Sequence, residues 1–147
     1  MNIYMFDTNI FNKMLDGRID VLKIKKKICK ATHIQFDEIQ ATKNGHRRAQ
    51  LEIVFNEIIT VQIPTESLVL GVSRLGMAKL SDGDLYKKLL VRLNALNNSK
   101  SNNIQDVLIA ETSINNKYIL VTDDRNLAQV TTDFGGKVCN LHEIIED

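Results

Sequence analysis

Short apolar segments alternate with longer segments of helical periodicity along the 147 residues of this chain. Strands are predicted at four places, each short enough to lie inside a sheet: Ile3–Phe6, His33–Gln35, Tyr118–Val121 and Lys137–Asn140. Strands that alternate with helices in this way are typical of a parallel sheet covered by helices. The pattern therefore predicts the α/β class, with a mainly parallel central sheet.

Helices are predicted where apolar residues recur every three or four positions. Thr8 or Asn9 can cap a short helix that runs to Leu15 and ends at Gly17. The other predicted helices are Val21–Lys30, Arg47–Ile59, a leucine-rich helix beginning at Asp82 or Asp84, Ile104–Asn116, a helix from Asp124 through Val130, and a last helix after Asn140. The segment 65–80 follows neither period clearly and stays unassigned.

The length fits one domain, spanning 1–147, with a core large enough to fold without disulfides or structural zinc. Nineteen Lys and Arg against eighteen Asp and Glu leave a net charge of +1, which excludes binding of polyanions by bulk charge alone. Cys29 and Cys139 lie in no metal-ligand or redox spacing, so reduced thiols are expected. The chain shows no signal-peptide pattern, and no apolar run approaches the roughly 18 residues of a membrane span. We therefore expect a cytoplasmic protein.

Four acidic residues far apart in the sequence each lie where a predicted strand or a polar loop leads into a helix: Asp7, Glu38, Asp106 and Asp124. In an α/β fold, the residues just past the carboxyl ends of the strands gather in one crevice. Carboxylates brought together there repel one another unless a cation lies between them. The pattern therefore predicts a hard divalent metal, with phosphate chemistry on it.

Each acid also has a purely structural explanation. Asp106 falls in the first turn of a predicted helix, where the helix dipole favours negative charge, and Asp124 can cap the helix that follows it. Glu38 follows Asp37 and fits a solvated helix face as well as a ligand site. Asp7 is the hardest to explain in this way, because an unpaired carboxylate at the end of a central strand is costly. The metal hypothesis depends on all four acids occurring together.

The order of these motifs resembles that of the PIN-domain nucleases across nearly the whole chain. The similar elements are an apolar strand ending in Asp7, Thr8 and Asn9, the acid Glu38, a D-x-x-I-A motif formed by Asp106, Ile109 and Ala110, and a T-x-D motif formed by Thr122 and Asp124. Each motif is short. Their order, and the tight spacing of the last two, carry the resemblance.

The resemblance implies a three-layer α/β/α sandwich with a mainly parallel central sheet, a Mg²⁺ or Mn²⁺ cofactor, and endonucleolytic cleavage of RNA. Many small members of the family act as the VapC-like toxin of a type II toxin–antitoxin pair. That role would add an antitoxin protein to the RNA substrate as a partner, and small PIN proteins often pair into homodimers. The active-site residues by themselves do not specify the toxin role.

A pocket of Asp and Glu without His or Cys suits Mg²⁺ or Mn²⁺ better than zinc, because both ions prefer oxygen ligands. We expect Asp7 and Asp106 to be the central metal ligands, with Asp124 and Glu38 binding a second position or orienting water. All four are then catalytic. Whether one or two metal ions bind is left open by the sequence.

Two polar residues are expected to fix these carboxylates by hydrogen bonds, Asn9 and Thr122, whereas Thr8 is expected to contribute its backbone. Asp123 occupies the variable position of the T-x-D motif, and a role as a helix cap or a partial ligand remains an alternative for it. Glu111 lies about 500° around the helix from the acid of the D-x-x-I-A motif, so we expect it to stand outside the site.

Cations are needed for substrate binding, because phosphates supply most of the affinity for nucleic acid. Lys43, Arg47 and Arg48 follow Glu38 closely in the sequence and are expected to bind the substrate. Aromatic residues that could stack on single-stranded bases are scarce, with three Tyr, five Phe and no Trp. Recognition through the backbone and shape of the RNA is therefore expected.

Two other function classes fit parts of the same pattern. A PIN-like module that binds RNA or regulates without cutting it would keep the fold, although the presence of all four acids favours activity. A haloacid-dehalogenase-like phosphatase also begins with a strand ending in Asp, but it requires a second Asp two residues later, where this chain has Asn9. The phosphatase is therefore the weaker alternative.

Overall fold

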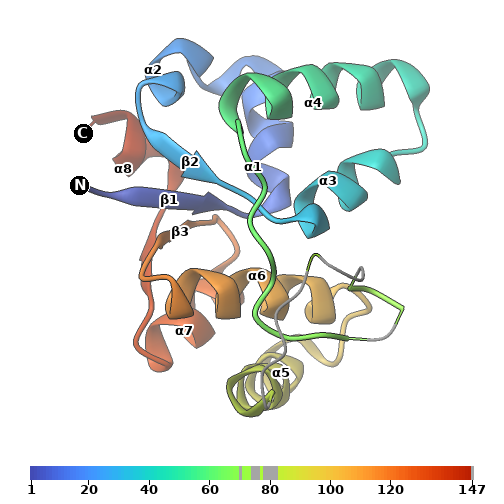
Figure 1. Cartoon of the computed structure of the whole chain (residues 1–147), viewed down its shortest axis with the longest axis vertical. Helices are drawn as coiled ribbons and strands as arrows, with labels where there is room; N and C mark the ends of the chain where they lie inside the picture. Colours follow the sequence, from blue (N-terminus) through green and yellow to red (C-terminus); the bar gives the residue numbers. More distant parts are fainter. Residues whose placement is uncertain (70, 74–76, 78–82, 147) are drawn as a thin grey trace.

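The computed structural model describes residues 1–69, 71–73, 77 and 83–146 (Figure 1). In this part of the chain, four strands form one sheet in the order β2-β1-β3-β4, and every pair of neighbours is parallel. The strands are β1 (Ile3–Phe6), β2 (Ile28–Lys30), β3 (Ile119–Val121) and β4 (Lys137–Cys139). None of the described helices is long and apolar enough to cross a membrane.

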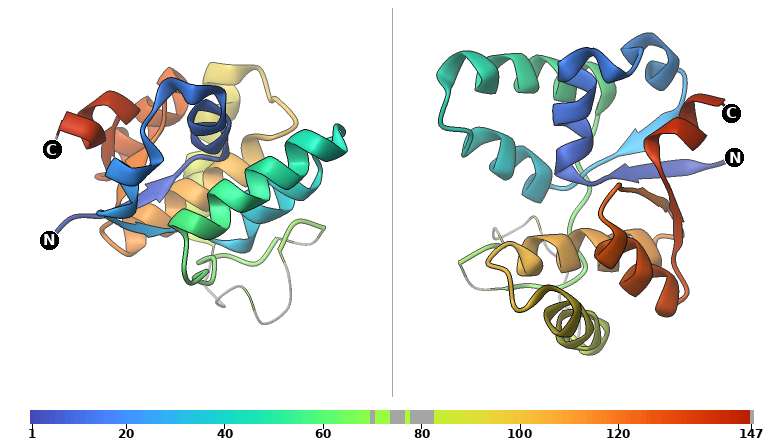
Figure 2. Two further views of the ribbon diagram at one scale, coloured as in Figure 1. Left: turned by 90° about the horizontal axis from the view of Figure 1, so that it is seen from above. Right: turned by 180° about the vertical axis from the view of Figure 1, so that it is seen from behind.

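Helices cover both faces of the sheet, as Figures 1 and 2 show. One face carries α1 (Thr8–Lys13), the π-helical turn η1 (Met14–Arg18), α2 (Val21–Lys25), α4 (Gly45–Ile58) and α8 (Leu141–Glu146). The other face carries α5 (Asp84–Asn97), α6 (Asn103–Asn115) and α7 (Arg125–Asp133). Helix α3 (His33–Gln40) lies beside the carboxyl end of the sheet. This arrangement confirms the predicted three-layer α/β/α sandwich.

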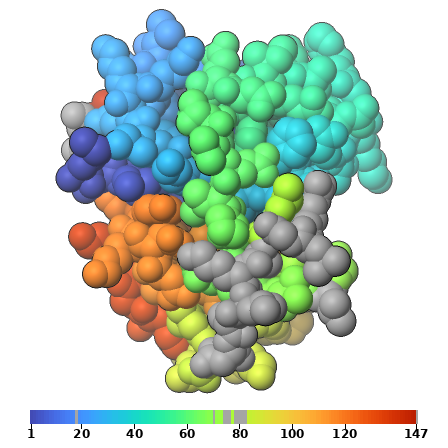
Figure 3. All heavy atoms as spheres, viewed as in Figure 1, coloured from blue at the N-terminus to red at the C-terminus, as the bar shows by residue number. Residues whose placement is uncertain are grey.

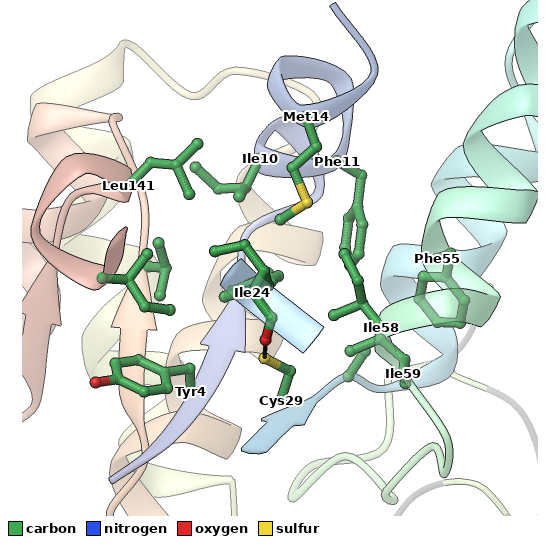
Figure 4. Packing of buried hydrophobic residues seen from close by; sticks show 14 of the residues in the cluster. Tyr4, Ile10, Phe11, Met14, Ile24, Cys29, Phe55, Ile58, Ile59 and Leu141 are labelled. Carbon is green, nitrogen blue, oxygen red and sulfur yellow. Dashed lines mark hydrogen bonds between the residues drawn. The ribbon is translucent and has the colours of Figure 1, made fainter. Parts of the chain in front are cut away.

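The alternation of side chains along β1 divides the core into two clusters. Tyr4 and Phe6 point into the cluster under α1, α2, α4 and α8, whereas Met5 points into the cluster under α5, α6 and α7. Figure 4 shows the first cluster, in which the rings of Phe11 and Phe55 pack with their centroids 5.2 Å apart. Because a strand with both faces buried needs apolar residues at every position, its sequence reads as a continuous apolar run.

Two predictions near β2 were wrong. The helix predicted at Val21–Lys30 ends at Lys25, because residues 28–30 pair with β1 in the register Ile3↔Ile28. The strand predicted at His33–Gln35 is the first turn of α3, where the Thr32 hydroxyl accepts the amide of Ile34 as a helix cap. A three-residue strand carries too little alternation to be told from a helical stripe.

The remaining predicted elements agree with the structure to within about two residues at each end, apart from the helix predicted through Val130, which runs three residues further as α7. The first helix loses its regular conformation at Gly17, whose φ of 75° is readily adopted only by glycine. Helix α5 begins at Asp84, and the alternative start at Asp82 lies outside the described residues. Much of the unassigned segment 65–80 also lies outside them.

The chain that leaves α4 contacts the residue that follows β2, at the edge of the sheet. Gln62 forms a parallel bridge with Ala31, and the Ile63 amide donates to the Ala31 carbonyl at 2.8 Å. Figure 3 shows this segment passing between the two helical layers on the face that it displays. The bridge and the hydrogen bond fix this segment against the end of β2.

A buried glutamine joins α3 to the end of β1. The Gln35 side chain is fully buried, its Nε2 donates to the Phe6 carbonyl at 3.0 Å, and its Oε1 accepts the amide and the hydroxyl of Thr32 at 2.9 and 2.7 Å. Because Asp7 directly follows Phe6, this contact fixes α3 relative to the first of the four acids. Sequence analysis missed this role because it placed Gln35 in a strand.

We predict that Gln35→Leu lowers the free energy of unfolding by about 2–4 kcal/mol, because two buried backbone groups lose their partner at about 1–3 kcal/mol each. Gln40→Leu is the matched control on the same helix, where the exposed side chain donates to Glu52, and its effect should stay within about 0.5 kcal/mol. Urea unfolding followed by circular dichroism measures both changes. Equal stability of the two variants would contradict this account of Gln35.

Candidate active site

The two innermost strands end side by side, and each is followed by an acid. Phe6 and Val121 are paired in the parallel ladder, and the Asp7 amide donates to the Val121 carbonyl at 3.0 Å. Asp7 occupies the N-cap position of α1, and Asp124 occupies that of α7. Adjacent strand ends therefore bring two residues together that are far apart in the sequence.

The other two acids come from helices at the same edge of the sheet. Asp106 lies in the first turn of α6 and is 6% exposed. Glu38 is half-buried in the second turn of α3, so the expected position at a strand-to-helix junction was wrong by about one turn. Both helices reach the carboxyl edge of the sheet, at the right in Figure 1. The four predicted acids therefore face one region.

Two threonine hydroxyls orient these carboxylates. The Thr122 hydroxyl donates to Asp7 Oδ2 at 3.0 Å and accepts the Asp124 amide at 3.1 Å, so Thr122 lies where the sequence placed it. The Thr8 hydroxyl donates to Glu38 Oε1 at 3.0 Å, although only its backbone was expected to contribute. Asn9 is exposed, and the group that lowers the pKa of Asp7 is its backbone amide rather than its side chain.

Burial and mutual repulsion raise the pKa of three of the acids. The pKa of Asp106 rises to about 8, first through burial and then through the charges of Asp7, Glu38 and Asp124. Burial raises the pKa of Glu38 to about 7, while the Thr8 hydrogen bond opposes this rise and the Asp7 charge adds to it.

Burial is also the largest cause of the raised pKa of Asp7, which Thr122 partly offsets and Asp124 increases. The amides of Thr8 and Asn9 lower this pKa as well, although Asp7 makes no capping hydrogen bond of standard geometry. Asp7 is thus close enough to disfavour ionisation of Glu38 and Asp106, and Asp124 is close enough to disfavour ionisation of Asp7 and Asp106.

Asp124 also carries the structural role that its position allows. Its Oδ1 accepts the amides of Asn126 and Leu127 at 2.9 and 3.1 Å, which caps α7. Capping fixes the rotamer of the side chain, and the carboxylate keeps its second oxygen for other contacts. The structural and the functional explanation of this acid are therefore compatible.

The four acids fit a hard divalent cation in their chemistry, because they offer oxygen atoms only and carry unfavourable mutual repulsion. Their spacing is looser than a closed ligand set: among the described residues, no three His, Cys, Asp or Glu side chains are placed to hold one ion together. Mg²⁺ commonly binds one or two carboxylates and keeps several waters. The donor set therefore fits such an ion with few protein ligands.

A hollow of about 430 Å³, here called the α1 hollow, opens beside the acids. It is lined by Asp7, Asn9, Ile10, Asn12, Lys13, Asp16, Asp123 and Asp124. Lys13 forms an ion pair with Asp123. The helix cap of α7 is Asp124, so Asp123 does not have the capping role that was its alternative. Sequence analysis missed Lys13; its place in the last turn of the helix that begins beside Asp7 was the available signal.

The three predicted substrate-binding cations occupy different environments. The Arg47 guanidinium donates to Asp16 at 2.9 Å and to Asn12 at 3.0 Å, both of which line the α1 hollow. The Arg48 guanidinium instead donates to the carbonyl of Thr42 at 3.1 Å. Lys43 is exposed on the loop before α4. Of the three, Arg47 is the one whose contacts connect it to the acids.

Glu111 lies outside the group of four acids. Its side chain is buried, and Oε2 accepts the Ser67 hydroxyl at 2.8 Å. Burial is the largest cause of its raised pKa, and the nearby charge that adds to the rise is Glu66 rather than Asp106. The expectation that Glu111 belongs to a different face of α6 thus agrees with its neighbours in the structure.

We predict that Asp106→Asn stabilises the protein at pH 8 when divalent cations are removed by chelator. The folded state keeps the Asp106 proton up to about pH 8, whereas the unfolded chain releases it near the ordinary pKa of 3.8. Stability therefore falls as the pH rises between these values, and the amide removes this loss. The expected rise in Tm is about 3 °C or more, measured by scanning calorimetry.

At pH 3 the same substitution should change Tm little, because the proton then stays mainly bound in the unfolded chain as well as in the folded state. Asp133→Asn is the control at an exposed ion pair with Arg92, and its effect should be small at either pH. If Asp106→Asn were no more stable than wild type at pH 8, the acids would not be destabilising the folded state.

Comparison with solved structures identifies the fold. One match is a chain of the crystal structure of VapBC2 from Rickettsia felis, and the TM-score is 0.59. In that structure VapBC2 is bound to a DNA fragment from its promoter. The two chains are 19% identical over 94% of this chain and 98% of that chain.

Two other matches have lower scores. VapBC-5 from Mycobacterium tuberculosis, a member of the VapBC family of toxin-antitoxin systems, matches with a TM-score of 0.47 and 17% identity over 95% of this chain and 98% of that chain. FitAcB from Neisseria gonorrhoeae matches with a TM-score of 0.45 and 14% identity over 93% of this chain and 96% of that chain. No protein-family model and no curated protein sequence matches the chain.

The match to the Rickettsia felis structure extends over nearly the whole of both chains. This chain has a parallel sheet with helices on both faces, which is the fold that the sequence motifs predict. The chain therefore shares its fold with a VapBC2 protein, and this fold is the PIN-like α/β/α sandwich.

Proposed function

We propose that this protein is a PIN-type endoribonuclease that hydrolyses RNA phosphodiester bonds with Mg²⁺ or Mn²⁺. The observation that carries the proposal is the convergence of four acids from separate elements at the carboxyl edge of the sheet, three of them with raised pKa values. Carboxyl groups with perturbed pKa values cluster at functional sites, even though their repulsion lowers the stability of the fold.

Asp7 and Asp106 are the proposed protein ligands of the cation, since they are the most buried of the four acids. Glu38 and Asp124 would complete its surroundings through water or at a second position. When bound, such a cation supplies Lewis-acid chemistry, stabilising charge on the phosphate and making water more acidic. The Thr122 hydroxyl holds the Asp7 carboxylate in one orientation for this purpose.

Glu38 is the proposed acceptor of the proton that the attacking water loses. Its pKa of about 7 lies near neutral pH, where a carboxyl group can both accept and release a proton. Because the Thr8 hydroxyl occupies Oε1, the proton would be received at Oε2. Thr8 then acts by holding the Glu38 carboxylate in one orientation.

Phosphate binding would fall to Lys13 and Arg47, which lie in or next to the α1 hollow. Both cations are paired with acids, Lys13 with Asp123 and Arg47 with Asp16. An RNA phosphate would compete with these carboxylates for the same donors. This arrangement supports contact with the RNA backbone without a strongly basic surface, in keeping with the net charge of +1.

The toxin of a toxin–antitoxin pair is the proposed biological role. Its support is the shared fold with a chain of the VapBC2 structure, in which the proteins are bound to a fragment of their own promoter. An antitoxin protein would then be the partner of this chain, alongside its RNA substrate. A short reading frame for such a protein next to the gene would support the role.

We predict that the wild-type protein cuts single-stranded RNA with Mg²⁺ or Mn²⁺ and that chelator stops the reaction. Asp7→Asn and Asp106→Asn should each slow cleavage by at least about 100-fold, because each removes a proposed ligand. Asp133→Asn, at an exposed position remote from the acids, should keep the wild-type rate. Rates are measured on a fluorescently labelled oligonucleotide with matched preparations of each variant.

Undiminished cleavage by Asp7→Asn would point to a contaminating nuclease or to another mechanism. RNA binding without cleavage by the wild type would instead favour the PIN-like binding module. Measuring RNA binding in a filter assay together with the rate of cleavage distinguishes these two results.

We also predict that Mn²⁺ raises the Tm of the wild-type protein at pH 8 but not that of Asp7→Asn or Asp106→Asn. A ligand at 100 times its Kd stabilises the folded state by about 2.7 kcal/mol. The measurement needs no RNA and is made by differential scanning fluorimetry. An equal shift in all three proteins would place the cation elsewhere on the chain.

A further inference from the structure

The loop between α5 and α6, residues 98–102, carries a lysine close to one of the four acids. Lys100 is exposed in this loop, and its backbone carbonyl accepts the amide of Asn103, the first residue of α6, at 3.1 Å. Asp106 lies in the first turn of the same helix, about 4.5 Å further along its axis. Figure 1 shows the loop leading from α5 to the start of α6. The backbone therefore brings Lys100 to the end of α6 that bears Asp106.

The charge of Lys100 acts on this acid. Burial and the charges of the other three acids raise the pKa of Asp106, whereas the charge of Lys100 lowers it. The ammonium group is thus near enough to the carboxyl group for electrostatic attraction. Lys13 and Arg47 are each paired with an Asp, but Lys100 forms no ion pair with a residue that the structure describes. Its ammonium group is therefore available to an anion that binds beside Asp106.

Asparagine side chains hold both ends of this loop. Asn97 Nδ2 donates to Asn103 Oδ1 at 3.1 Å, and Asn103 Nδ2 donates to Asn94 Oδ1 at 2.9 Å. Asn97 and Asn103 are 6% and 1% exposed, and hydrogen bonds shielded from water in this way are strong. They tie the last turns of α5 to the first residue of α6. The loop that bears Lys100 is therefore closed by buried contacts.

The same network reaches the helix that Asp124 caps. The side-chain amide of Asn126 donates to Asn97 Oδ1, while the backbone amide of Asn126 donates to Asp124 Oδ1 at 2.9 Å. Hydrogen bonds thus lead from the Asp124 carboxylate through Asn126 and Asn97 to the start of α6. The position of the loop is fixed relative to two of the acids, one on each side of this network.

We propose that Lys100 binds a phosphate of the RNA on the α6 side of the acids, and that the buried asparagine bonds hold its loop in the binding position. The inference rests on the proposed nuclease function and adds a substrate-binding residue to it. Lys13 belongs to the helical layer of α1, whereas Lys100 joins two helices of the opposite layer. Cations from both layers would then hold the RNA backbone on either side of the acids. Contacts of this kind raise affinity without reading the base sequence.

The first test is the salt dependence of RNA affinity in Lys100→Gln, which removes the charge at an exposed position. Lys87→Gln is the matched control, because Lys87 is exposed on α5 about 15 Å along the axis from Asn97. Affinity for a labelled single-stranded RNA is measured by fluorescence anisotropy in Mg²⁺ at several salt concentrations. All of these proteins also carry Glu38→Gln, which removes the proposed proton acceptor so that the RNA stays intact.

We expect Lys100→Gln to lower the slope of log affinity against log salt concentration by about 0.7, the value for one phosphate contact on a single strand. Lys100→Arg should restore the slope, and Lys87→Gln should leave it unchanged. In proteins that keep Glu38, Lys100→Gln should raise KM for RNA about 2- to 5-fold with little change in kcat, as expected for the loss of one exposed ion pair.

The second test concerns the asparagine network. Asn97→Leu removes two of its hydrogen bonds at nearly constant side-chain volume, and Asn115→Leu is the control at an exposed position of α6. If the network positions Lys100, Asn97→Leu weakens RNA binding and adding Lys100→Gln to it weakens binding little further. Independent, additive effects of the two substitutions would overturn the positioning role. The Lys100 variants decide the phosphate contact by themselves, since this residue is exposed.

An unchanged salt slope in Lys100→Gln, in a protein whose wild type cuts RNA, would overturn the inference and leave the nuclease proposal intact. Lys100 would then only offset the repulsion among the acids, and Lys100→Gln would lower Tm in chelator without affecting RNA. A wild-type protein that binds RNA but does not cut it would overturn the nuclease proposal instead. In that case a slope lowered by Lys100→Gln still supports the phosphate contact, because the binding measurement requires no cleavage.

Discussion

Repulsion between carboxylates is the constraint around which this structure is organised. Asp7 and Asp106 are 5% and 6% exposed, and each lies within the electrostatic influence of Asp124. Burial disfavours the ionised form of these carboxyls and is the largest cause of their raised pKa values, and repulsion from the neighbouring acids raises these pKa values further. The fold keeps the acids together because the two central strands end at the same level and fix the residues that follow them. A group of carboxyls of this kind lowers the stability of the folded state.

The stabilisation that opposes this repulsion comes from two apolar layers and a few buried hydrogen bonds. Alternate residues of β1 enter different layers, so the strand that ends in Asp7 is packed from both faces. Gln35 ties the same strand to α3, and Thr8 ties α1 to the acid on α3. Each contact joins one helix to the end of β1 or to the residues just after it. The position of Glu38 relative to Asp7 is therefore set by one fully buried and one partly buried polar contact.

The surroundings of the acids differ on their two sides. The α1 hollow is lined mainly by polar and charged residues, with Lys13 within it and Arg47 bonded to two of its residues. On the other side, a smaller and partly apolar hollow of about 220 Å³ is lined by Ile34, Asp37, Glu38, Ala41, Gly71, Val72 and Gln105. The acids therefore border a charged surface on one side and a partly apolar surface on the other.

The sequence by itself determined the α/β class, most of the helices and three of the four strands, because periodicity and capping are local properties of the chain. It also predicted that four acids would meet at one edge of the sheet, since residues after parallel strands collect there. Only the tertiary structure decided that residues 28–30 form a strand, because a segment of three residues becomes a strand by pairing with β1. The contacts of Gln35 with Phe6, of Thr8 with Glu38 and of Lys13 with Asp123 were likewise decided by the fold. Each joins residues remote in sequence through side chains, and no local pattern encodes which distant partner a side chain will meet.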